Sequence, residues 1–473
     1  MPEPLWQFDA LLAASAGRAE GRADAITGIS IDTRTLAPGD LYVAIKGNRL
    51  DGHEFVAQAF AAGAAAALVS DDYAAMDGVG PLIRVADPLE VLGRIACAAR
   101  ARSSAHVIAI TGSVGKTGTK EALRQCLSVF GPTHVAERSF NNHWGVPLTL
   151  ARMPAKTAFG VFEIGMNHPG EITPLTKMVR PHTALVTNVE PVHLGFFESV
   201  EQIADAKAEI FDGLEPSGTA ILNRDNPHFA RLRGRALSAG AGRILTFGAD
   251  PAADVRLANV EPGTNGSDFN ADLLGTPVKC RIGAPGLHVV QNALAVLAAL
   301  QAAGVDVARG AEELAKLRAP KGRGARTVYE TARGRIMVID ESYNANPASM
   351  AAALSAMAHV PRREFPRRVV VLGDMLELGD RSKELHLGLL QPVLDAGVDL
   401  VLACGSNMVE LYDVLPAAMK GAYAVDAEGL RLALLETVRG GDVVMLKGSL
   451  GSRIGPLVDA LSERLNDAQV AKD

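Results

Sequence analysis

The chain carries Thr111-Gly112-Ser113-Val114-Gly115-Lys116-Thr117 directly behind the apolar run of residues 107–110. Residues 120–127 follow with the apolar spacing of a helix. A strand, a glycine loop and a helix in this order can bind phosphate, because glycines let backbone N–H groups turn toward an anion and the helix N-terminus adds partial positive charge. The stretch therefore predicts a protein that uses a nucleotide triphosphate.

Two side chains of this loop have predicted roles. Lys116 would reach the terminal phosphates, and the Thr117 hydroxyl would ligate Mg²⁺. The match to G-x-x-x-x-G-K-[ST] is incomplete, because Ile110 stands where the first glycine belongs. The alternative is a glycine-rich turn with an ordinary exposed lysine. The strand before the loop and the helix after it favour phosphate binding.

Bulk composition narrows the class of protein. The chain has 473 residues, with 47 Lys and Arg against 53 Asp and Glu, a net charge of −6. This length predicts two to four domains, and without a basic block nucleic acid is not an expected partner. Four cysteines lie far apart without zinc spacing, as in a reduced cytoplasmic protein. Neither a signal peptide nor an apolar run of membrane-spanning length is found, so no membrane insertion is expected.

The chain divides into three predicted α/β domains: residues 1–102, 103–318 and 319–473. The first has short strands at 29–31, 41–45 and 67–69, with helices at 54–62 and 88–101. Polar residues at 100–104 and glycine-bearing residues at 318–324 are the predicted joints.

Strand–helix alternation in the second and third domains predicts mostly parallel, doubly wound sheets. In the second domain, closely spaced strands at 255–260, 268–273 and 278–282 predict a small antiparallel appendage. The third domain has a Rossmann-like layout. It lacks a G-x-G-x-x-G opening, so no dinucleotide is assigned to it.

Polar side chains follow several predicted strands, where ligands of open α/β sheets gather. Glu163 follows the strand at 158–162, Asn188 follows the strand at 184–187 with His193 five residues later, and Asp340 and Asp374 follow strands of the third domain. A carboxylate and an imidazole near a triphosphate suit a Mg²⁺ site. The alternatives are a helix-capping Glu163 and a hydrogen-bonded loop His193.

Three further features are ambiguous by pattern alone. Lys207 reads as an exposed helical lysine among acidic neighbours. Asn141 and Asn142 read first as a turn, and their amides could equally bind a ligand. Residues 341–349 form a polar stretch at a strand end, with Pro347 near the first turn of a helix.

Taken together, these motifs resemble the Mur ligase family, the ATP-dependent amide-forming enzymes of peptidoglycan precursor synthesis. The resemblance covers essentially the whole chain, and the compressed glycine loop is the form that this family uses. Shared motifs are the loop, Glu163, residues 188–193, Asn292 and Gly322-Arg323. Residues 141–149, 342–350 and 373–379 resemble the members that add D-alanyl-D-alanine to UDP-N-acetylmuramoyl-tripeptide.

The sequence departs from the family pattern at three places. Glu341 stands where a second aspartate is expected after Asp340, and Val289 stands where asparagine is common. Glu190-Pro191-Val192 precedes His193, where a small residue and alanine are more usual. None of these departures touches the phosphate loop or Glu163.

The resemblance implies a role for each matching residue. Lys116 would bind the γ-phosphate, Thr117 and Glu163 one Mg²⁺, and His193 with a carbamylated Lys207 a second. The implied ATP site is Gly112, Ser113, Val114, Gly115, Lys116, Thr117, Asn292, Arg323 and Asp340. The implied substrate residues are Ser30, Asp32, Arg34, Lys46 and His53 at the UDP end, and Asn141, Asn142, Tyr343, Asn344 and Asn346 elsewhere.

The resemblance also implies an activity: a carboxylate activated by ATP as an acyl phosphate is attacked by the amine of a dipeptide. Partners would then be UDP-N-acetylmuramoyl-tripeptide and D-alanyl-D-alanine, with ATP and Mg²⁺ as cofactors, in a monomer whose three domains close over ATP. Alternatives are a sister ligase that adds a single amino acid, a ligase like folylpolyglutamate synthase, and a non-catalytic nucleotide-dependent scaffold.

Overall fold

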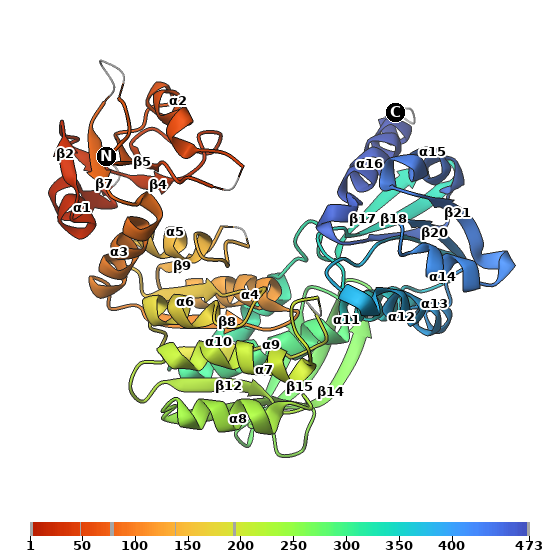
Figure 1. The fold of residues 1–473 in the computed structure, drawn as a ribbon. Helices are drawn as coiled ribbons and strands as arrows, with labels where there is room; N and C mark the ends of the chain where they lie inside the picture. The colour runs from red at the N-terminus through yellow and green to blue at the C-terminus, as the bar shows by residue number, and fades with distance from the viewer. Residues whose placement is uncertain (1–2, 48, 76–79, 138, 193–194, 471–473) are drawn as a thin grey trace.

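The computed structural model describes residues 3–47, 49–75, 80–137, 139–192 and 195–470, with the side chains of 468–470 left aside. Its strands form a five-stranded sheet near the N-terminus, a nine-stranded sheet in the centre and a six-stranded sheet toward the C-terminus. In Figure 1 the first and last of these stand as two arms above the central sheet. The predicted three-part α/β architecture is confirmed.

The N-terminal part has sheet order β2-β7-β6-β5-β4, with a separate β1–β3 pair. Strands β4 to β7 pair in parallel and β2 joins the edge in the antiparallel sense. Its elements are β1 Trp6–Gln7, α1 Phe8–Ser15, β2 Arg18–Glu20, β3 Ala25–Ile26, β4 Gly28–Ser30, β5 Asp40–Val43, α2 Val56–Ala61, β6 Ala66–Ser70, β7 Leu82–Val85 and α3 Pro88–Ala101.

The central part has sheet order β16-β15-β14-β13-β12-β11-β8-β10-β9. Its elements are β8 His106–Thr111, α4 Lys116–Ser128, β9 Thr133–Val135, α5 Gly145–Ala151, β10 Phe159–Glu163, α6 Ile172–Val179, β11 Thr183–Val186, α7 Val200–Ala208, β12 Thr219–Asn223, α8 Phe229–Ser238, β13 Arg243–Gly248, β14 Val255–Gly263, β15 Gly266–Leu273, β16 Thr276–Ile282, α9 Leu287–Ala302 and α10 Val307–Glu312. The antiparallel strands β14 to β16 continue the parallel sheet at its edge.

Successive side chains of the central strands point alternately into two hydrophobic cores, one on each face of the sheet. On β8, Val107 and Ala109 face the core beneath α3, α5 and α6, whereas Ile108 and Ile110 face the core beneath α4 and α9. A parallel strand covered on both faces needs a continuous apolar run, and residues 107–110 provide one. The carboxyl end of this strand is therefore held rigidly where the glycine loop begins.

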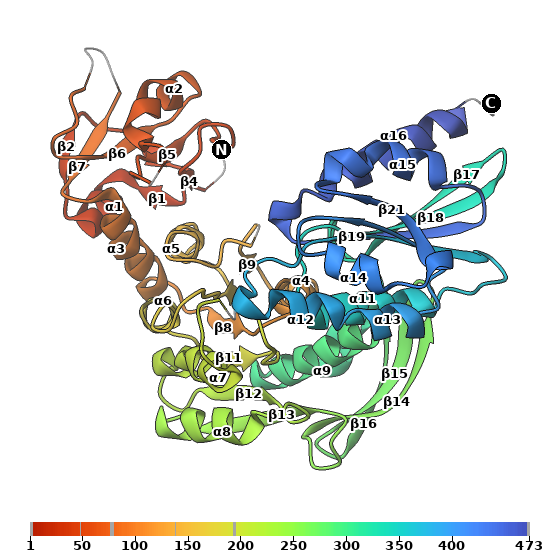
Figure 2. The same cartoon turned by 45° about the vertical axis from the view of Figure 1, so that its right-hand side comes forward.

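The C-terminal part has sheet order β17-β18-β22-β19-β20-β21, antiparallel only between β17 and β18. Its elements are β17 Ala325–Thr331, β18 Gly334–Glu341, α11 Pro347–Ala358, β19 Arg367–Gly373, α12 Ser382–Leu387, α13 Leu390–Asp395, β20 Leu400–Cys404, α14 Val409–Val414, β21 Lys420–Ala424, α15 Ala427–Thr437, β22 Asp442–Lys447 and α16 Gly455–Val470. Helix α11 lies beside α9 at the border with the central part (Figure 2).

The two predicted joints differ. Arg100 lies inside helix α3, is buried, and donates hydrogen bonds to the carbonyls of Val179 and Arg180, each at 2.9 Å. The predicted joint at 100–104 therefore begins inside helix α3, and Arg100 anchors this helix to the central part. Residues 321–324 form a turn, as predicted, and Gly322 at φ +78° has the conformation that glycine tolerates best. Among the described helices, none has both the length and the apolar content to span a bilayer.

Candidate active site

The glycine loop connects β8 to the N-terminus of α4. Gly112 has φ +148°, and a Cβ there would collide with the Thr187 hydroxyl, so this position requires glycine. Gly115, at φ +87°, is the residue before the first turn of α4. The N–H groups of Lys116, Thr117 and Gly118 lie in that first turn, where a helix provides no internal acceptor. This geometry suits the anion site that the strand–loop–helix pattern predicts.

The end of strand β11 holds the loop in shape. Asn188 accepts from the N–H of Ser113 through its carbonyl at 3.1 Å and from the N–H of Val114 through its side chain at 3.0 Å. The Thr187 hydroxyl donates to the Val114 carbonyl at 2.6 Å. The N–H groups of Ser113 and Val114 thus stabilise the loop itself. The loop N–H groups that remain for an anion are those of the turn at 115–118.

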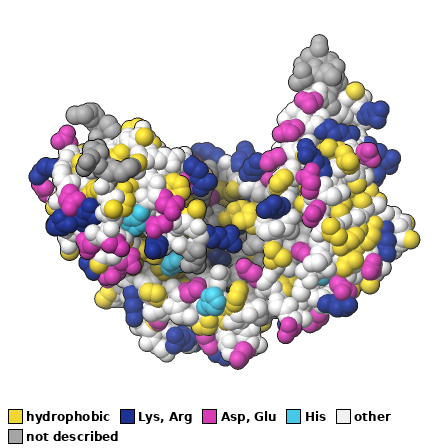
Figure 3. All heavy atoms as spheres, turned by 45° about the horizontal axis from the view of Figure 1, so that its top comes forward, with side chains coloured by type: hydrophobic (Ala, Val, Ile, Leu, Met, Phe, Trp, Pro, Cys, Tyr) yellow, Lys and Arg dark blue, Asp and Glu magenta, His cyan; other side chains and the backbone are white. Residues whose placement is uncertain are grey.

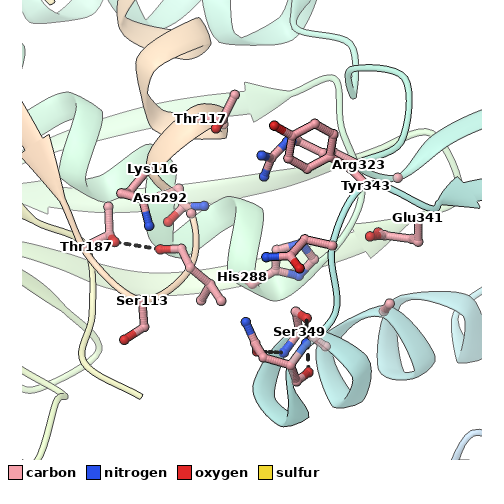
Figure 4. A pocket seen from close by; sticks show the side chains of 18 of the residues that line it. Ser113, Lys116, Thr117, Thr187, His288, Asn292, Arg323, Glu341, Tyr343 and Ser349 are labelled. Atoms are coloured by element: carbon pink, nitrogen blue, oxygen red, sulfur yellow. Dashed lines mark hydrogen bonds between the residues drawn. The ribbon is translucent and has the colours of Figure 1, made fainter. Parts of the chain in front are cut away.

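Lys116 crosses the loop. Its Nζ donates to the Gly112 carbonyl at 2.5 Å. Burial lowers the pKa of Lys116, Glu163 acts against that shift, and the positive charge of Arg323 adds to it. Figure 4 shows Lys116 beside Asn292, which helix α9 supplies and which packs against Gly115.

An oxygen-rich cluster lies next to the loop. Glu163 is 2% exposed and accepts from the Thr117 hydroxyl at 2.9 Å and from the Asn141 amide at 2.8 Å. Hydroxyl and carboxylate oxygens beside a triphosphate site are the donors that Mg²⁺ prefers. Among the described residues no group of three or more His, Cys, Asp and Glu could hold a metal. The fit to Mg²⁺ rests instead on the Thr117 hydroxyl and the Glu163 carboxylate, which are oxygen ligands of the kind that this ion takes.

The expectation that Lys207 is exposed is wrong. It is 2% exposed on α7 and lines the same cleft as Lys116. Burial, together with the positive charge of Lys116, lowers the pKa of Lys207 well below its ordinary value. The acidic neighbours that suggested a solvated face are engaged elsewhere: Asp205 pairs with Arg231, and Glu209 caps the start of α6. Burial therefore disfavours the charged form of Lys207.

The C-terminal part forms the facing wall. The Arg323 guanidinium lies 4.1 Å from the centre of the Tyr343 ring and donates to the Ser139 hydroxyl at 3.4 Å. Figure 4 shows this stacked pair above the cleft. Asn344 and Asn346 also line the cleft. The Asn346 side chain accepts from the Ser349 N–H as the N-cap of α11, so its side-chain oxygen is used in capping the helix.

Two predicted ligands turn away from this central cleft. Asp340 is buried, and its carboxylate accepts from the Gly322 N–H at 2.8 Å and from the Ser342 hydroxyl at 2.6 Å. It therefore holds the turn between the two parts in place. The Asn142 side chain accepts from the Gly145 N–H at 2.9 Å, as expected if this residue forms a turn. The Asn141 side chain instead donates to Glu163.

A second, N-terminal cleft lies between the N-terminal and central parts, on the other side of α5. Ser30, Asp32 and Arg34 line it from one side, and Trp144 and Arg152 line it from the other. Asp32 and Arg34 form an exposed ion pair at 2.6 Å. Arg152 donates to the Ile29 carbonyl at 2.6 Å and ties the two parts together. In Figure 3 the molecule is hollowed between its arms, and lysine and arginine side chains gather along the hollow.

Lys46 and His53 do not line the N-terminal cleft. His53 uses both ring nitrogens inside the N-terminal part: Nδ1 lies 2.6 Å from Asp51 Oδ1, and Nε2 accepts from the Ser70 N–H at 3.0 Å. The backbone of Lys46 forms an isolated antiparallel β-bridge with that of Asp51. Both sets of contacts lie within the N-terminal part.

The structure therefore brings most of the predicted residues to two sites. The central cleft gathers Ser113, Val114, Gly115, Lys116, Thr117, Asn141, Glu163, Lys207, Asn292, Arg323, Tyr343, Asn344 and Asn346. His193 lies outside the described residues. Sequence reasoning missed the contributions of Thr187, Ser139, Arg326 and Lys447. Lys447 had a usable signal, since it ends the apolar strand β22 in the way that Glu163 ends β10.

Comparison with known proteins places these sites in a family. Family models match at residues 25–100 (Mur ligase family, catalytic domain), 110–300 (Mur ligase middle domain) and 326–450 (Mur ligase, glutamate ligase domain). The chain is 35% identical over 450 residues to UDP-N-acetylmuramoyl-tripeptide--D-alanyl-D-alanine ligase of Escherichia coli, covering 94% of this chain and 96% of that one.

Two solved structures extend the likeness to the fold. MurF from Acinetobacter baumannii matches with a TM-score of 0.84 at 31% identity, covering 98% of this chain and all of that one. MurF ligase from Thermotoga maritima in complex with ADP matches with a TM-score of 0.76 at 25% identity, covering 93% and 98%. The chain belongs to the Mur ligase family.

Proposed function

We propose that this chain joins D-alanyl-D-alanine to UDP-N-acetylmuramoyl-tripeptide with hydrolysis of ATP to ADP and phosphate. The observation that carries the proposal is the central cleft, where the first turn of α4, the Thr117–Glu163 pair and the buried Lys207 meet the wall of the C-terminal part. The E. coli relative has this ligase activity in its name, and the likeness runs through all three parts of the chain. Residues 1–102, 103–318 and 319–473 are the proposed domains.

The chemistry follows from what ATP does to a carboxylate. Amide formation from a carboxylate and an amine is uphill in water. Transfer of the γ-phosphoryl group to the tripeptide carboxylate gives an acyl phosphate, which has a good leaving group. The dipeptide amine attacks the carbonyl carbon, and the tetrahedral intermediate collapses to amide and phosphate. The protein contributes mainly positioning and charge neutralisation.

The nucleotide lies along the first turn of α4 in this proposal. The N–H groups at 116–118 bind phosphate oxygens, and Lys116 leaves the Gly112 carbonyl to neutralise the γ-phosphate. Asn292 and Arg323 border the nucleotide from α9 and from the joint with the C-terminal part. Asp340 acts indirectly, since it fixes the turn that carries Arg323.

Thr117 and Glu163 would hold Mg²⁺, with Asn141 orienting the carboxylate. When bound, the ion supplies charge neutralisation for the transferring phosphoryl group. A second metal would involve Lys207 and His193, as the family resemblance implies.

Lys207 has the chemistry for carbamylation. Only the neutral amine adds to carbon dioxide, and burial near Lys116 lowers the pKa of Lys207, which favours this form. Addition forms an N–C bond and releases one proton, which turns a buried amine into an anion beside a cation. The carbamate would be a metal ligand. Replacement of Lys207 by alanine should abolish turnover, with partial rescue by a short-chain carboxylate.

The N-terminal cleft receives the UDP end of the donor in this proposal. Asp32 and Arg34 offer polar groups from the N-terminal part, and Arg152 adds a cation from the central part. The tripeptide would then extend toward the central cleft. The enzyme is proposed to act as a cytoplasmic monomer.

The direct test measures phosphate release from ATP by the purified protein. UDP-N-acetylmuramoyl-tripeptide and D-alanyl-D-alanine are omitted in turn, and the product is identified by mass. Release that requires both substrates, with a pentapeptide product, is the expected result. Release with a free amino acid in place of the dipeptide would move the enzyme to a sister step. A protein that binds ATP without turnover would be a scaffold.

A further inference from the structure

The C-terminal wall of the central cleft carries two exposed leucines that the nucleotide and metal sites leave unexplained. Leu376 is 42% exposed and Leu450 is 66% exposed, and both line the cleft. Leu376 reaches the backbone of the residue after Leu450, because a Cβ at Gly451 would come within 2.7 Å of Leu376 Cδ1. Large apolar side chains facing a substrate cleft indicate contact with an apolar part of a ligand.

A charged pair lies along the same wall. Lys447 is buried, and its Nζ donates to Glu341 at 3.2 Å and to the Asn344 carbonyl at 3.0 Å. The contacts are continuous from this pair to the leucines, since the Ser449 hydroxyl donates to the Ala345 carbonyl and accepts from the Leu376 N–H at 2.9 Å. The wall thus combines one cation, one anion and a small apolar surface.

These groups lie at the carboxyl ends of three neighbouring strands. Glu341 ends β18, Lys447 ends β22 and the loop of Leu376 follows β19, in the sheet order β18-β22-β19. Open parallel sheets bind ligands at this edge. The position is separate from the first turn of α4, which belongs to the central sheet.

Buried hydrogen bonds fix the loop that carries Leu376. Asp374 accepts from the N–H groups of Asn407 and Met408, and the fully buried His386 accepts from the Met375 N–H at 3.1 Å. Glu377, which follows Leu376, has φ +64°, a value that is rare for a residue with a side chain. Its carbonyl accepts from the N–H of Gly195 in the central part at 3.3 Å. A backbone strained in this way persists only where its surroundings fix it, so Leu376 has a defined position.

We infer that Leu376 and Leu450 form the seat for the side chains of the incoming dipeptide, and that they determine its specificity for short apolar residues. The inference rests on the proposed ligase function. A dipeptide of D-alanine carries two methyl groups, and this wall offers a matching apolar surface next to the Lys447–Glu341 pair. The proposed phosphate site lies on the other wall, at the first turn of α4, and leaves this surface free.

The test combines changes in the enzyme with matching changes in the dipeptide substrate. Wild type, Leu376→Ala and Leu450→Ala are assayed with D-alanyl-D-alanine, D-alanylglycine and glycyl-D-alanine. Wild type should lose on the order of tenfold in kcat/KM when a seated methyl is removed from the substrate. Each variant should show a similar loss with D-alanyl-D-alanine and should no longer discriminate against the dipeptide that lacks the methyl contacted by that leucine. KM for ATP and for the UDP-linked donor should stay unchanged.

Matched controls exist on the same part of the chain. Leu394→Ala on α13 and Leu432→Ala on α15 remove leucines that are 40% and 73% exposed and do not line the cleft. They should retain the wild-type discrimination. Equal melting temperatures for the cleft and control variants would exclude a folding effect.

Two outcomes would overturn the inference. Losses in the variants that are equal for all three dipeptides would mean that the leucines act without touching the substrate methyl groups. A rise in KM for every substrate together would mean that they serve contact between domains. Wild type that turns over no dipeptide would instead contradict the proposed function, so the two failures are distinguishable.

Discussion

The two clefts of this enzyme use charged residues in opposite ways. In the central cleft Glu163 and Lys207 are each 2% exposed, and burial shifts the pKa of Lys207 far from its ordinary value. In the N-terminal cleft Asp32 and Arg34 pair in solvent, with the Arg34 side chain 84% exposed. Buried charges act strongly on one another because little water screens them, whereas exposed pairs contribute little. The comparison indicates chemistry at the first cleft and recognition at the second.

Replacing Lys116 by methionine should cause the largest loss of activity at the central cleft. Loss of the cation that neutralises the γ-phosphate should lower kcat by about 10³-fold. Steady-state phosphate release measures this effect. Lys383→Met is the control, because Lys383 is an exposed partner of Glu410 in the C-terminal part and should retain full activity. A Lys116 variant with near-normal turnover would contradict the assigned anion site.

Glu163→Gln changes charge at nearly constant shape. The amide can still accept from Thr117, but it cannot neutralise a metal ion, so kcat should fall by about 10²-fold and half-saturation should need more Mg²⁺. A magnesium titration of turnover distinguishes the two effects. Glu384→Gln, on an exposed ion pair with Arg381, is the matched control. An unchanged magnesium requirement would remove Glu163 from the metal site.

Lys207→Met should separate function from stability. Turnover should disappear, yet the protein should melt at a higher temperature, because a buried amine is replaced by an apolar side chain of similar length. The folded-state pKa of Lys207 lies below its unfolded value of 10.5, so the unfolded chain binds more protons between the two values, and wild-type stability rises with pH there.

The stability gained by Lys207→Met should therefore be largest at low and neutral pH and should shrink as pH approaches 10.5. Melting scans in buffers free of carbon dioxide measure it, at about 2–4 °C for each kcal/mol. A variant that is less stable than wild type across this range would show that the amine makes net favourable contacts in the folded state.

Substitutions in the N-terminal cleft should change the enzyme's kinetics less than those in the central cleft. Arg34→Ala should raise KM for the UDP-linked donor by about tenfold with little change in kcat, and the effect should diminish at high salt because exposed charges are screened. Donor titrations at two ionic strengths provide the measurement. A drop in kcat at saturating donor would place Arg34 in the chemistry and would weaken the contrast between the clefts.

His53→Ala should have the smallest effect on catalysis. Both ring nitrogens are engaged within the N-terminal part, so the variant should lose about 1–3 kcal/mol of unfolding free energy while KM for the donor stays constant. Chemical denaturation and donor titration report the two quantities separately. A raised donor KM in a stable variant would restore His53 to the substrate site.

The fold could be predicted well from the sequence because its signals are local. The apolar run at 107–110 and the strand–helix alternation beyond it are periodic patterns within short windows, and they predicted the parallel sheets. Helix α3 was predicted with its bounds, Pro88–Ala101, since a proline in the first turn and an amphipathic pattern mark it. The contacts of its last turn could not be predicted, because Arg100 donates to the carbonyls of Val179 and Arg180, about 80 residues away.

The candidate site shows the same division. The glycine loop and Glu163 could be identified from the sequence, because strand ends and glycine spacing are local signals. Burial decided the rest, and burial depends on what packs around a residue. It placed Lys207 inside the cleft, directed Asp340 to the turn at Gly322, and left His53 bound to Ser70. The sequence alone determined which chemical groups are available, whereas the tertiary structure decided which of them meet, because their partners come from distant parts of the chain.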